Sequence, residues 1–236
     1  MFINRGYCNC CCRHVLFMSK DDWFRDHYKC LNCGSIPRER AIMYCIDKFV
    51  PAWKEKVIHE SSPAPRGASA RLRAEGKHYI SSQFLPEIKS GSSKDGILCE
   101  DLESLSFEDN SIDLHVTQDV FEHLFNPDKA LKEIYRTLRP GGVHIFTTPL
   151  VNKNNPTQWY AKKNLTNEIE YLVTPPEYHG NPISEEGSLV TVHWGYDIVD
   201  YIYSHTKMPT HIVHIDNLGL GIRAEYIEVL INFKSI

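Results

Sequence analysis

The sequence contains no long apolar run. None of its apolar stretches approaches the roughly 20 residues that a membrane-spanning helix requires. The first ten residues, MFINRGYCNC, also lack the apolar block of a secretory signal. We therefore expect a soluble, cytoplasmic protein with no membrane partner.

Positive charge is scarce in most of the chain. Residues 1–56 contain 10 Lys and Arg against 6 Asp and Glu, a balance of +4, and the remainder contains 16 against 24, a balance of −8. Enzymes that act on nucleic acids usually need a basic path to the active site, because phosphate contacts supply most of the sequence-independent affinity. The acidic remainder therefore argues against nucleic acid as a partner.

The length and composition indicate one full α/β core with a small appendage. The chain has 236 residues, of which 42% are hydrophobic and 24% charged. We expect a Cys-rich segment with a linking helix over residues 1–50 and the α/β domain over 51–236. Nothing in the sequence indicates the oligomeric state.

Cysteine is concentrated at one end of the chain. Six of the 8 cysteines lie within the first 33 residues, and 18 residues separate the pair Cys8-x-x-Cys11 from the pair Cys30-x-x-Cys33. Each pair can direct two thiolates at one ion, and the two pairs complete a tetrahedral site with no open position. The spacing predicts a structural zinc site at Cys8, Cys11, Cys30 and Cys33.

The register of the first cysteine cluster has alternatives. Cys10 and Cys12 form a C-x-C pair and could replace nominal ligands, or all these thiols could be reduced and unliganded. A helix should follow from Pro37 to Pro51 and connect this segment to the main sheet. Arg38 and Arg40 in its first turn could reach an acidic ligand, but we expect them to be a solvated pair of charges.

The rest of the chain alternates between predicted strands and helices. The pattern indicates a parallel sheet with helices on its faces, completed by an antiparallel edge. The expected strands are 56–60, 78–82, 96–100, 112–117, 143–148, 211–216 and 226–233, and the expected helices are 68–75, 127–138 and 195–205. We expect a Pro-Gly-Gly turn at residues 140–142 to end the helix at 127–138.

Two segments carry a resemblance to a known family. CEDLESLSFEDNSIDLHVTQDVFEHL at 99–124 and LKEIYRTLRPGGVHIFTTP at 131–149 resemble the class I S-adenosylmethionine-dependent methyltransferases, in particular the methyltransferase type 11-like group. The segment from Cys30 to Arg40 also resembles the C-x-x-C-G-S-x-x-R-x-R knuckle found ahead of some methyltransferase domains. The resemblance implies a Rossmann-like, seven-stranded fold and S-adenosylmethionine as cofactor.

The resemblance also implies which residues bind the cofactor. The adenine should meet Asp101 and Leu102, the ribose Ser82 and Gln83, and the amino-acid group Glu60, Ser61 and Ser62, with Gln118 and Asp119 beside them. Read without the family, Asp101 could instead cap the turn that follows it. The family's usual G-x-G-x-G after the first strand is absent, and HESSP at 59–63 is similar to a variant that lacks the glycines.

Acceptor activation is the least constrained part of the site. The resemblance puts His123 at the rim of the cleft, either as a general base or as a residue that positions a helix. An insertion at about 150–192 should form the substrate wall, with Tyr178 and His179 contacting the acceptor or accepting its proton, or else packing the loop.

The expected reaction is methyl transfer to an oxygen or nitrogen atom of a small molecule or saccharide. Two alternatives stay open on the sequence. One is an RNA methyltransferase that uses the zinc segment to grip RNA. The other is a non-catalytic binding protein with the same fold, which the missing glycines and Gln83 would suit.

Overall fold

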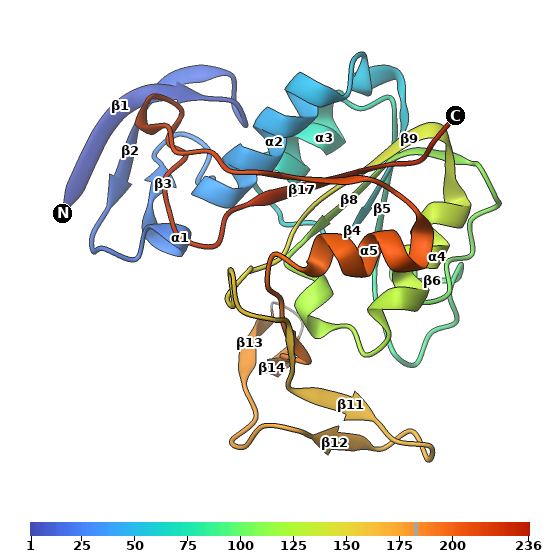
Figure 1. Ribbon diagram of the computed structural model, residues 1–236. Coiled ribbons are helices and arrows are strands. Elements are labelled where there is room, and N and C mark those ends of the chain that lie inside the picture. The colour runs from blue at the N-terminus through green and yellow to red at the C-terminus, as the bar shows by residue number, and fades with distance from the viewer. Residues whose placement is uncertain (182–183) are drawn as a thin grey trace.

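A computed structural model describes residues 1–181 and 184–236 (Figure 1). A central sheet of eight strands has the order β16-β17-β9-β8-β4-β5-β7-β6. The strands of this sheet are β4 (Val57–Ser61), β5 (His78–Gln83), β6 (Ser93–Lys94), β7 (Ile97–Cys99), β8 (Ile112–Gln118), β9 (Leu138–Thr147), β16 (Thr210–Val213) and β17 (Val229–Phe233). The seven expected strands are all present, and the two-residue β6 is added at one edge.

The sheet is mixed in the expected way. The five strands from β7 to β9 are parallel, because β4 pairs in parallel with β5 and β8, β5 with β7, and β8 with β9. Strands β17 and β16 continue the sheet beyond β9 through antiparallel pairings. All five parallel strands therefore end at the same edge of the sheet, where open α/β sheets bind their ligands.

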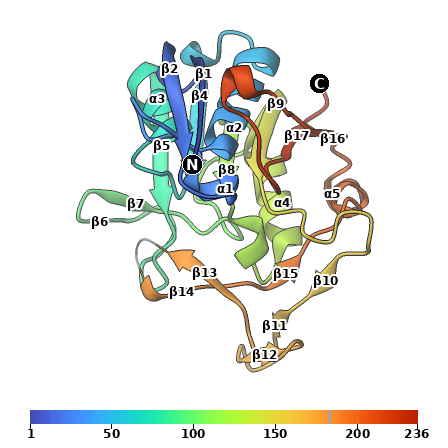
Figure 2. The ribbon, with the colours of Figure 1, turned by 90° about the vertical axis from the view of Figure 1, so that its left-hand side faces the viewer.

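Helices cover both faces of the sheet (Figures 1 and 2). One face packs against α2 (Pro37–Phe49) and α3 (Gly67–Glu75), and the other against α4 (Pro127–Thr137) and α5 (Ile198–Thr206). Strand β17 shows the alternation that this requires. Val229 and Ile231 are buried in the first core and Leu230 in the second, because successive side chains of a strand point to opposite faces.

The predicted Pro-Gly-Gly turn is incorporated into a strand. Strand β9 begins at Leu138, which pairs with Ile112, and the register then shifts so that Val143 pairs with Leu114. The intervening residues form a bulge in which Gly141 has a φ of +76°, a value that favours glycine. Helix α4 therefore ends one residue before its expected end, and the Pro-Gly-Gly segment lies within strand β9 and does not form a separate turn.

The N-terminal segment forms its own small sheet. Strands β1 (Phe2–Cys8), β2 (Arg13–Ser19) and β3 (Lys29–Cys30) pair antiparallel, and the short helix α1 (Phe24–His27) follows β2. The buried residues of this segment, of α2 and of the central sheet form one continuous cluster. The boundary at residue 50 stays a prediction, because the core runs across it.

Arg40 holds this segment to the rest of the chain, and the expectation that it is solvated is wrong. Its side chain is fully buried and stacks on the ring of Phe17, 4.7 Å from the centroid. The guanidinium donates to backbone carbonyls of Ser35, of Tyr28 at 2.8 Å and of Gly221 at 2.8 Å. A buried cation requires such partners, and here they come from three separate segments.

The C-terminal loop closes over the N-terminal strands. Gly6 in β1 lies against the backbone carbonyl of Gly219, so closely that a Cβ atom at Gly6 would collide with it. Asn4 Nδ2 donates to the carbonyl of Leu218 at 2.5 Å. The loop around residues 218–221 therefore covers a sheet built from the first 30 residues, and Figure 2 shows the two as adjacent ribbons.

Three histidines lie inside the central sheet. His59, His115 and His144 are fully buried. Ser82 Oγ lies 2.8 Å from His59 Nε2, the Nδ1 atoms of His59 and His115 are 3.0 Å apart, and His115 Nε2 lies 2.8 Å from Thr137 Oγ1. Because the Thr137 hydroxyl donates to Glu133 O at 2.8 Å, it must accept from His115. His115 Nδ1 then accepts from His59 Nδ1, and His59 Nε2 accepts from the Ser82 hydroxyl. The rings of His59 and His115 are therefore neutral, and every donor in the series has an acceptor.

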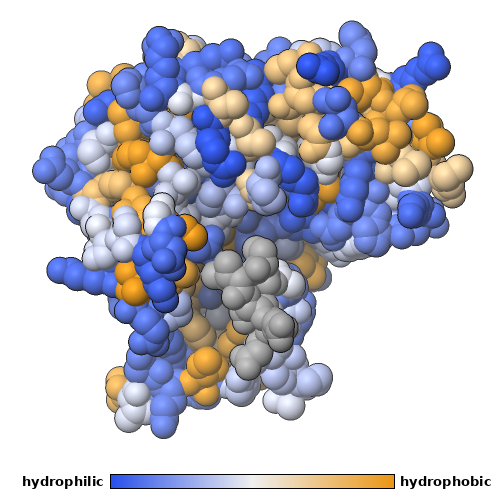
Figure 3. Space-filling view, turned by 180° about the vertical axis from the view of Figure 1, so that it is seen from behind, coloured by the Kyte–Doolittle hydropathy of each residue, from blue (hydrophilic) through white to orange (hydrophobic). Residues whose placement is uncertain are grey.

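The expected insertion projects beyond the carboxyl edge of the sheet (Figures 1 and 3). It contains β10 (Gln158–Trp159), β11 (Ala161–Lys163), β12 (Ile169–Tyr171), β13 (Tyr178–Asn181), β14 (Ser184–Leu189) and β15 (Val192–His193), of which β11 and β12, and β13 and β14, form hairpins. Among the residues described, no helix has the length and apolarity to cross a lipid bilayer.

The buried histidines predict that the fold weakens in mild acid. Burial lowers the pKa of His59 and of His144 to about 3 and that of His115 well below its ordinary value. Below about pH 6.5 the unfolded chain binds protons that the folded chain does not. The stabilisation that comes from these neutral rings is therefore fully present above that pH and is lost as the pH falls toward 3.

Each buried histidine should cost about 1.4 kcal/mol of unfolding free energy between pH 7.5 and 5.5, or ~4 kcal/mol for three. Urea unfolding at both pH values measures the drop. The pH dependence should change by about 1.4 kcal/mol in His144→Phe relative to the parent protein, and it should match the parent in the control His78→Gln, whose imidazole is exposed. The same pH dependence in the parent protein and in His144→Phe would contradict the assignment.

Candidate active site

The candidate site lies where the strand order reverses. Strand β4 has β5 on one side and β8 on the other, so their connections leave the sheet on opposite faces at its carboxyl edge. This is the crevice in which open α/β sheets bind ligands. The predicted cofactor residues follow or end β4, β5, β7 and β8, and the topology brings them to this one edge.

Glu60 lies near the carboxyl end of β4 and is buried there. Its carboxylate accepts hydrogen bonds from Ser69 Oγ (2.6 Å), Tyr79 OH (2.7 Å) and Gln118 Nε2 (2.9 Å), and its side chain is fully buried. Burial raises its pKa despite these donors. The structure thus joins Glu60 and Gln118, two of the predicted cofactor residues, in one hydrogen-bonded group that also includes the start of α3.

In the turn after β4, a serine adopts the backbone conformation for which the family usually has a glycine. Ser62 has a φ of +55°, in the left-handed region that glycine normally occupies, and its N–H donates to Ser82 O at 2.8 Å. Gln83 Nε2 donates to Ser62 Oγ at 3.3 Å, which joins the two predicted binding loops. Ser61 is buried, and the hydroxyl of Ser82 faces His59 in the sheet interior.

Asp101 lies directly after β7 and does cap a turn. Its Oδ1 accepts from the N–H of Glu103 at 2.8 Å, and its own N–H donates to Ser90 Oγ at 3.1 Å. Burial raises the pKa of Asp101. Leu102 is buried beside it. Glu100 accepts from Ser90 and from Ser106 N (2.9 Å), which fixes the loop on both sides of Asp101.

Asp119 has ion-pair partners that the sequence did not reveal. Arg25 Nη2 lies 2.6 Å and Arg38 Nε 3.0 Å from Asp119 Oδ2, and Thr147 Oγ1 donates to Oδ1 at 2.9 Å. Burial opposes ionisation, but the two guanidinium groups lower the pKa of Asp119 below its ordinary value. The N-terminal segment therefore reaches the carboxyl edge of the sheet, and the expectation that Arg38 is a solvated residue is wrong.

Glu122 and His123 follow in the one-turn helix η2 (Phe121–His123). Glu122 is buried, Thr148 Oγ1 donates to its Oε2 at 2.9 Å, and burial together with the charge of Asp119 raises its pKa to about 8. His123 Nδ1 lies 2.8 Å from the carbonyl of Leu189. Since a carbonyl only accepts, Nδ1 carries the proton and Nε2 has a free lone pair.

The insertion brings His179 to His123. Their rings meet edge to face with centroids 5.3 Å apart, and His179 Nε2 lies 3.2 Å from Glu177 Oε1. Tyr178 precedes His179 in β13, so its side chain points to the opposite face of the hairpin. There its hydroxyl lies 3.5 Å from that of Tyr171. The structure therefore groups the two predicted histidines and separates them from Tyr178.

The four nominal cysteine ligands form one cluster. The sulfur atoms of Cys8 and Cys33 are 3.8 Å apart and those of Cys11 and Cys30 are 4.0 Å apart. Tetrahedral zinc with Zn–S bonds of about 2.3 Å needs sulfur atoms about 3.8 Å apart, so the spacing fits. The thiols of Cys10 and Cys12 donate instead to the carbonyls of Glu39 and Asn9, which argues against their alternative register.

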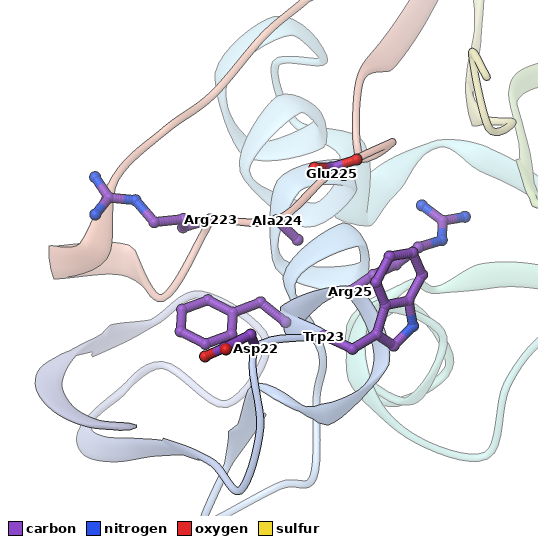
Figure 4. A pocket seen from close by; sticks show the side chains of 7 residues that line it. Asp22, Trp23, Arg25, Arg223, Ala224 and Glu225 are labelled. Carbon is purple, nitrogen blue, oxygen red and sulfur yellow. The ribbon is translucent and has the colours of Figure 1, made fainter. Parts of the chain in front are cut away.

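A cavity of about 240 Å³ lies between α1 and the C-terminal loop (Figure 4). Asp22, Trp23, Phe24 and Arg25 line one side, and Arg223, Ala224 and Glu225 the other. In Figure 4 the guanidinium groups of Arg25 and Arg223 lie at opposite ends of it. Arg25 also pairs with Asp119, so this cavity borders the candidate site without containing its predicted cofactor residues.

Residues 74–146 match the family model of the methyltransferase domain. Among solved structures, an S-adenosylmethionine-dependent methyltransferase from Mesorhizobium loti superposes with a TM-score of 0.51 at 12% identity, covering 82% of this chain and 97% of that one. One chain of a complex that contains the Haloferax volcanii Trm112 methyltransferase activator superposes with a TM-score of 0.50 at 16% identity, covering 84% and 90%. No curated protein matches the chain in sequence.

The family match lies on the segment from α3 to β9, which contains the predicted adenine loop and the end of β8. The two superpositions extend the likeness in fold to more than four fifths of the chain. The fold class predicted from the sequence is thereby confirmed: the chain has the class I fold of the S-adenosylmethionine-dependent methyltransferases. The match of residues 74–146 to the methyltransferase domain supports the predicted enzyme class.

Proposed function

We propose that the protein transfers a methyl group from S-adenosylmethionine to an oxygen or nitrogen atom of a small molecule or saccharide. The observation that carries this proposal is the convergence of Ser62, Gln83, Asp101 and Gln118 at the carboxyl edge of four parallel strands within the matched fold.

The side chains at this edge suit the parts of the cofactor in turn. In the proposed complex, Asp101 Oδ2 accepts from the adenine amino group, because Oδ1 is already used by Glu103. Leu102 packs against the base, and Gln83 meets the ribose hydroxyls through its amide. Ser61 and Ser62 face the amino-acid group, and Glu60, Gln118, Ser82 and Asp119 hold the loops around it.

Bound S-adenosylmethionine supplies a methyl group that its sulfonium already makes electrophilic. The protein must then align an acceptor atom with the methyl–sulfur bond, exclude water and manage one proton. We propose that His123 and His179 activate the acceptor, since they meet at the rim from two different elements. Tyr178 would contribute to the acceptor-binding wall from the other face of its hairpin.

The charge distribution favours a small acceptor. The remainder of the chain after residue 56 carries a net charge of −8, and a polyanion would be repelled from a site in this part of the protein. The insertion that carries His179 adds Glu168, Glu170 and Glu177 beside Lys162 and Lys163, so it does not supply a basic path.

We propose in addition that Cys8, Cys11, Cys30 and Cys33 hold a structural zinc ion. Four sulfur ligands leave no open position, so the ion would stabilise the N-terminal segment without taking part in the reaction. All eight cysteines lie in the part of the chain that the structure describes and none forms a disulfide, which suits a reducing compartment such as the cytoplasm.

Replacing Asp101 by Asn should weaken cofactor binding. The amide oxygen of the Asp101→Asn variant would keep the cap for the N–H of Glu103, but its N–H₂ group would face the adenine amino group, so an acceptor is replaced by a donor. Loss of a hydrogen bond to a charged group costs about 1.5–3 kcal/mol, which corresponds to about 10- to 100-fold in Kd.

Calorimetry with S-adenosylhomocysteine measures this change. The control Asp95→Asn, in the exposed turn between β6 and β7, should bind like the parent protein. No binding to the parent protein would favour the non-catalytic alternative, and equal binding by Asp101→Asn would remove Asp101 from the adenine site.

Replacing Cys30 by Ser should remove the zinc ion and loosen the N-terminal segment. Protein reconstituted with Co²⁺ should show intense cobalt–thiolate charge-transfer absorption, because all four ligands are sulfur. Cys30→Ser should lose this absorption and melt at a lower temperature. The control Cys12→Ser should keep both, since Cys12 is exposed and lies outside the cluster. Unchanged absorption in Cys30→Ser would refute the ligand set.

Labelled methyl transfer tests the acceptor class directly. The protein is incubated with S-adenosylmethionine labelled in the methyl group and, separately, with a panel of saccharides and small amines and with total RNA. Label should enter the small-molecule fraction and be lost in the double variant His123→Ala, His179→Ala. Label in RNA that falls steeply with added salt would instead support the RNA methyltransferase alternative.

A further inference from the structure

The carboxylate of Glu122, at the rim of the crevice, is only partly satisfied. Its Oε1 atom is buried and has no hydrogen-bond partner among the residues that the structure describes. The neighbouring oxygen, Oε2, is satisfied by Thr148, so the carboxylate is held in a fixed orientation. An oxygen buried in this way costs free energy unless something compensates it.

A second acceptor lies close to this oxygen. His123 Nε2 lies 3.8 Å from Glu122 Oε1. Its lone pair is free because Nδ1 donates to Leu189 O at 2.8 Å. Two lone pairs therefore face each other in a buried space, at a separation too long for a single shared proton. A cation between them would satisfy both.

A third ligand completes the group. One ring nitrogen of His179 lies with a carboxylate oxygen of Glu122 and a ring nitrogen of His123 in a set whose ligand atoms are all within 4.8 Å of one another. His179 Nε2 faces the carboxylate of Glu177 at 3.2 Å, and such carboxylate–histidine pairs orient histidines that bind metals. Glu177 Oε2 also lies 3.0 Å from His193 Nε2.

We propose that Glu122, His123 and His179 form a binding site for a divalent transition-metal ion at the rim of the cleft. Two imidazoles and one carboxylate suit Zn²⁺, Co²⁺, Mn²⁺ or Fe²⁺ better than Mg²⁺ or Ca²⁺, which prefer oxygen ligands alone. Ligand atoms around an ion with bonds of about 2.1 Å lie about 3–3.4 Å apart, so each group must move by less than about 1 Å.

The site differs in kind from the cysteine cluster. Three protein ligands leave coordination positions open, whereas four thiolates leave none. Two of the ligands follow β8 and the third comes from β13 in the insertion, so a bound ion would also fasten the insertion to the edge of the sheet.

The chemical role of the ion rests on the proposed function. An open position would bind a hydroxyl of the acceptor and promote loss of its proton to solvent. The hydroxyl oxygen then forms the new bond to the methyl carbon, and the carbon–sulfur bond breaks with its electron pair remaining on sulfur. The ligand set thus narrows the acceptor to one that presents a hydroxyl group, such as a saccharide.

Co²⁺ added to protein whose cysteine cluster is filled with Zn²⁺ tests the site. The parent protein should bind one equivalent and show weak visible bands without cobalt–thiolate charge transfer. His179→Ala and Glu122→Gln should each weaken binding at least about 10-fold. The matched control His211→Gln, with an exposed imidazole on β16, should bind normally. Circular dichroism of each variant checks that it is folded.

Two results would overturn the proposal. One is an absence of Co²⁺ binding beyond the cysteine cluster, and the other is equal binding in the parent protein, His179→Ala and Glu122→Gln. The second result is expected if Glu122 is only a protonated buried acid, which glutamine imitates. The titration contains neither cofactor nor acceptor, so its failure would leave the methyltransferase proposal intact, and failure of the S-adenosylhomocysteine titration would leave the metal site intact.

Discussion

The ion pairs of Asp119 with Arg25 and Arg38 are the interaction on which the arrangement of the site depends. Asp119 directly follows β8 with a φ of +52°, and the two guanidinium groups come from α1 and α2. A carboxylate that is this buried is stable as an anion only when cations are supplied. The N-terminal segment supplies them, so it forms part of the wall of the crevice as well as containing the cysteine cluster.

Most of the architecture could be predicted from the sequence because the signals are local. The short apolar strand segments, the amphipathic helix α4 and the cysteine spacing each depend on residues a few positions apart, and all three are found as expected. The same is true of Asp101, whose place at the end of β7 follows from the strand that precedes it. Strand ends shifted by one to five residues, most clearly where β9 absorbs the Pro-Gly-Gly segment.

The contacts that the sequence did not reveal connect residues far apart in the chain. Arg25 and Asp119, Arg40 and Gly221, and Gly6 and Gly219 are separated by 94 to more than 200 positions. No periodicity links such residues, and an arginine in the first turn of a helix looks solvated until its partners are known. The grouping of Glu122 with His123 and His179 is of the same kind, because it depends on how the insertion folds back. A useful signal was present all the same: Glu122 stands next to a predicted site histidine, in a segment with few exposed residues.

The contacts between the N-terminal strands and the loop around residues 218–221 affect the order in which parts of the molecule reach their final packing. The cysteine-rich sheet is synthesised before the C-terminal loop, yet Gly6 packs on Gly219 and the buried Arg40 needs the carbonyl of Gly221. Until those late residues are made, the guanidinium lacks one of its acceptors and the ring of Phe17 lacks part of its cover. The cysteine-rich segment therefore reaches its final packing only after the much later residues 219–221 are made, and its thiols remain accessible to metal ions, and to oxidants, during the interval.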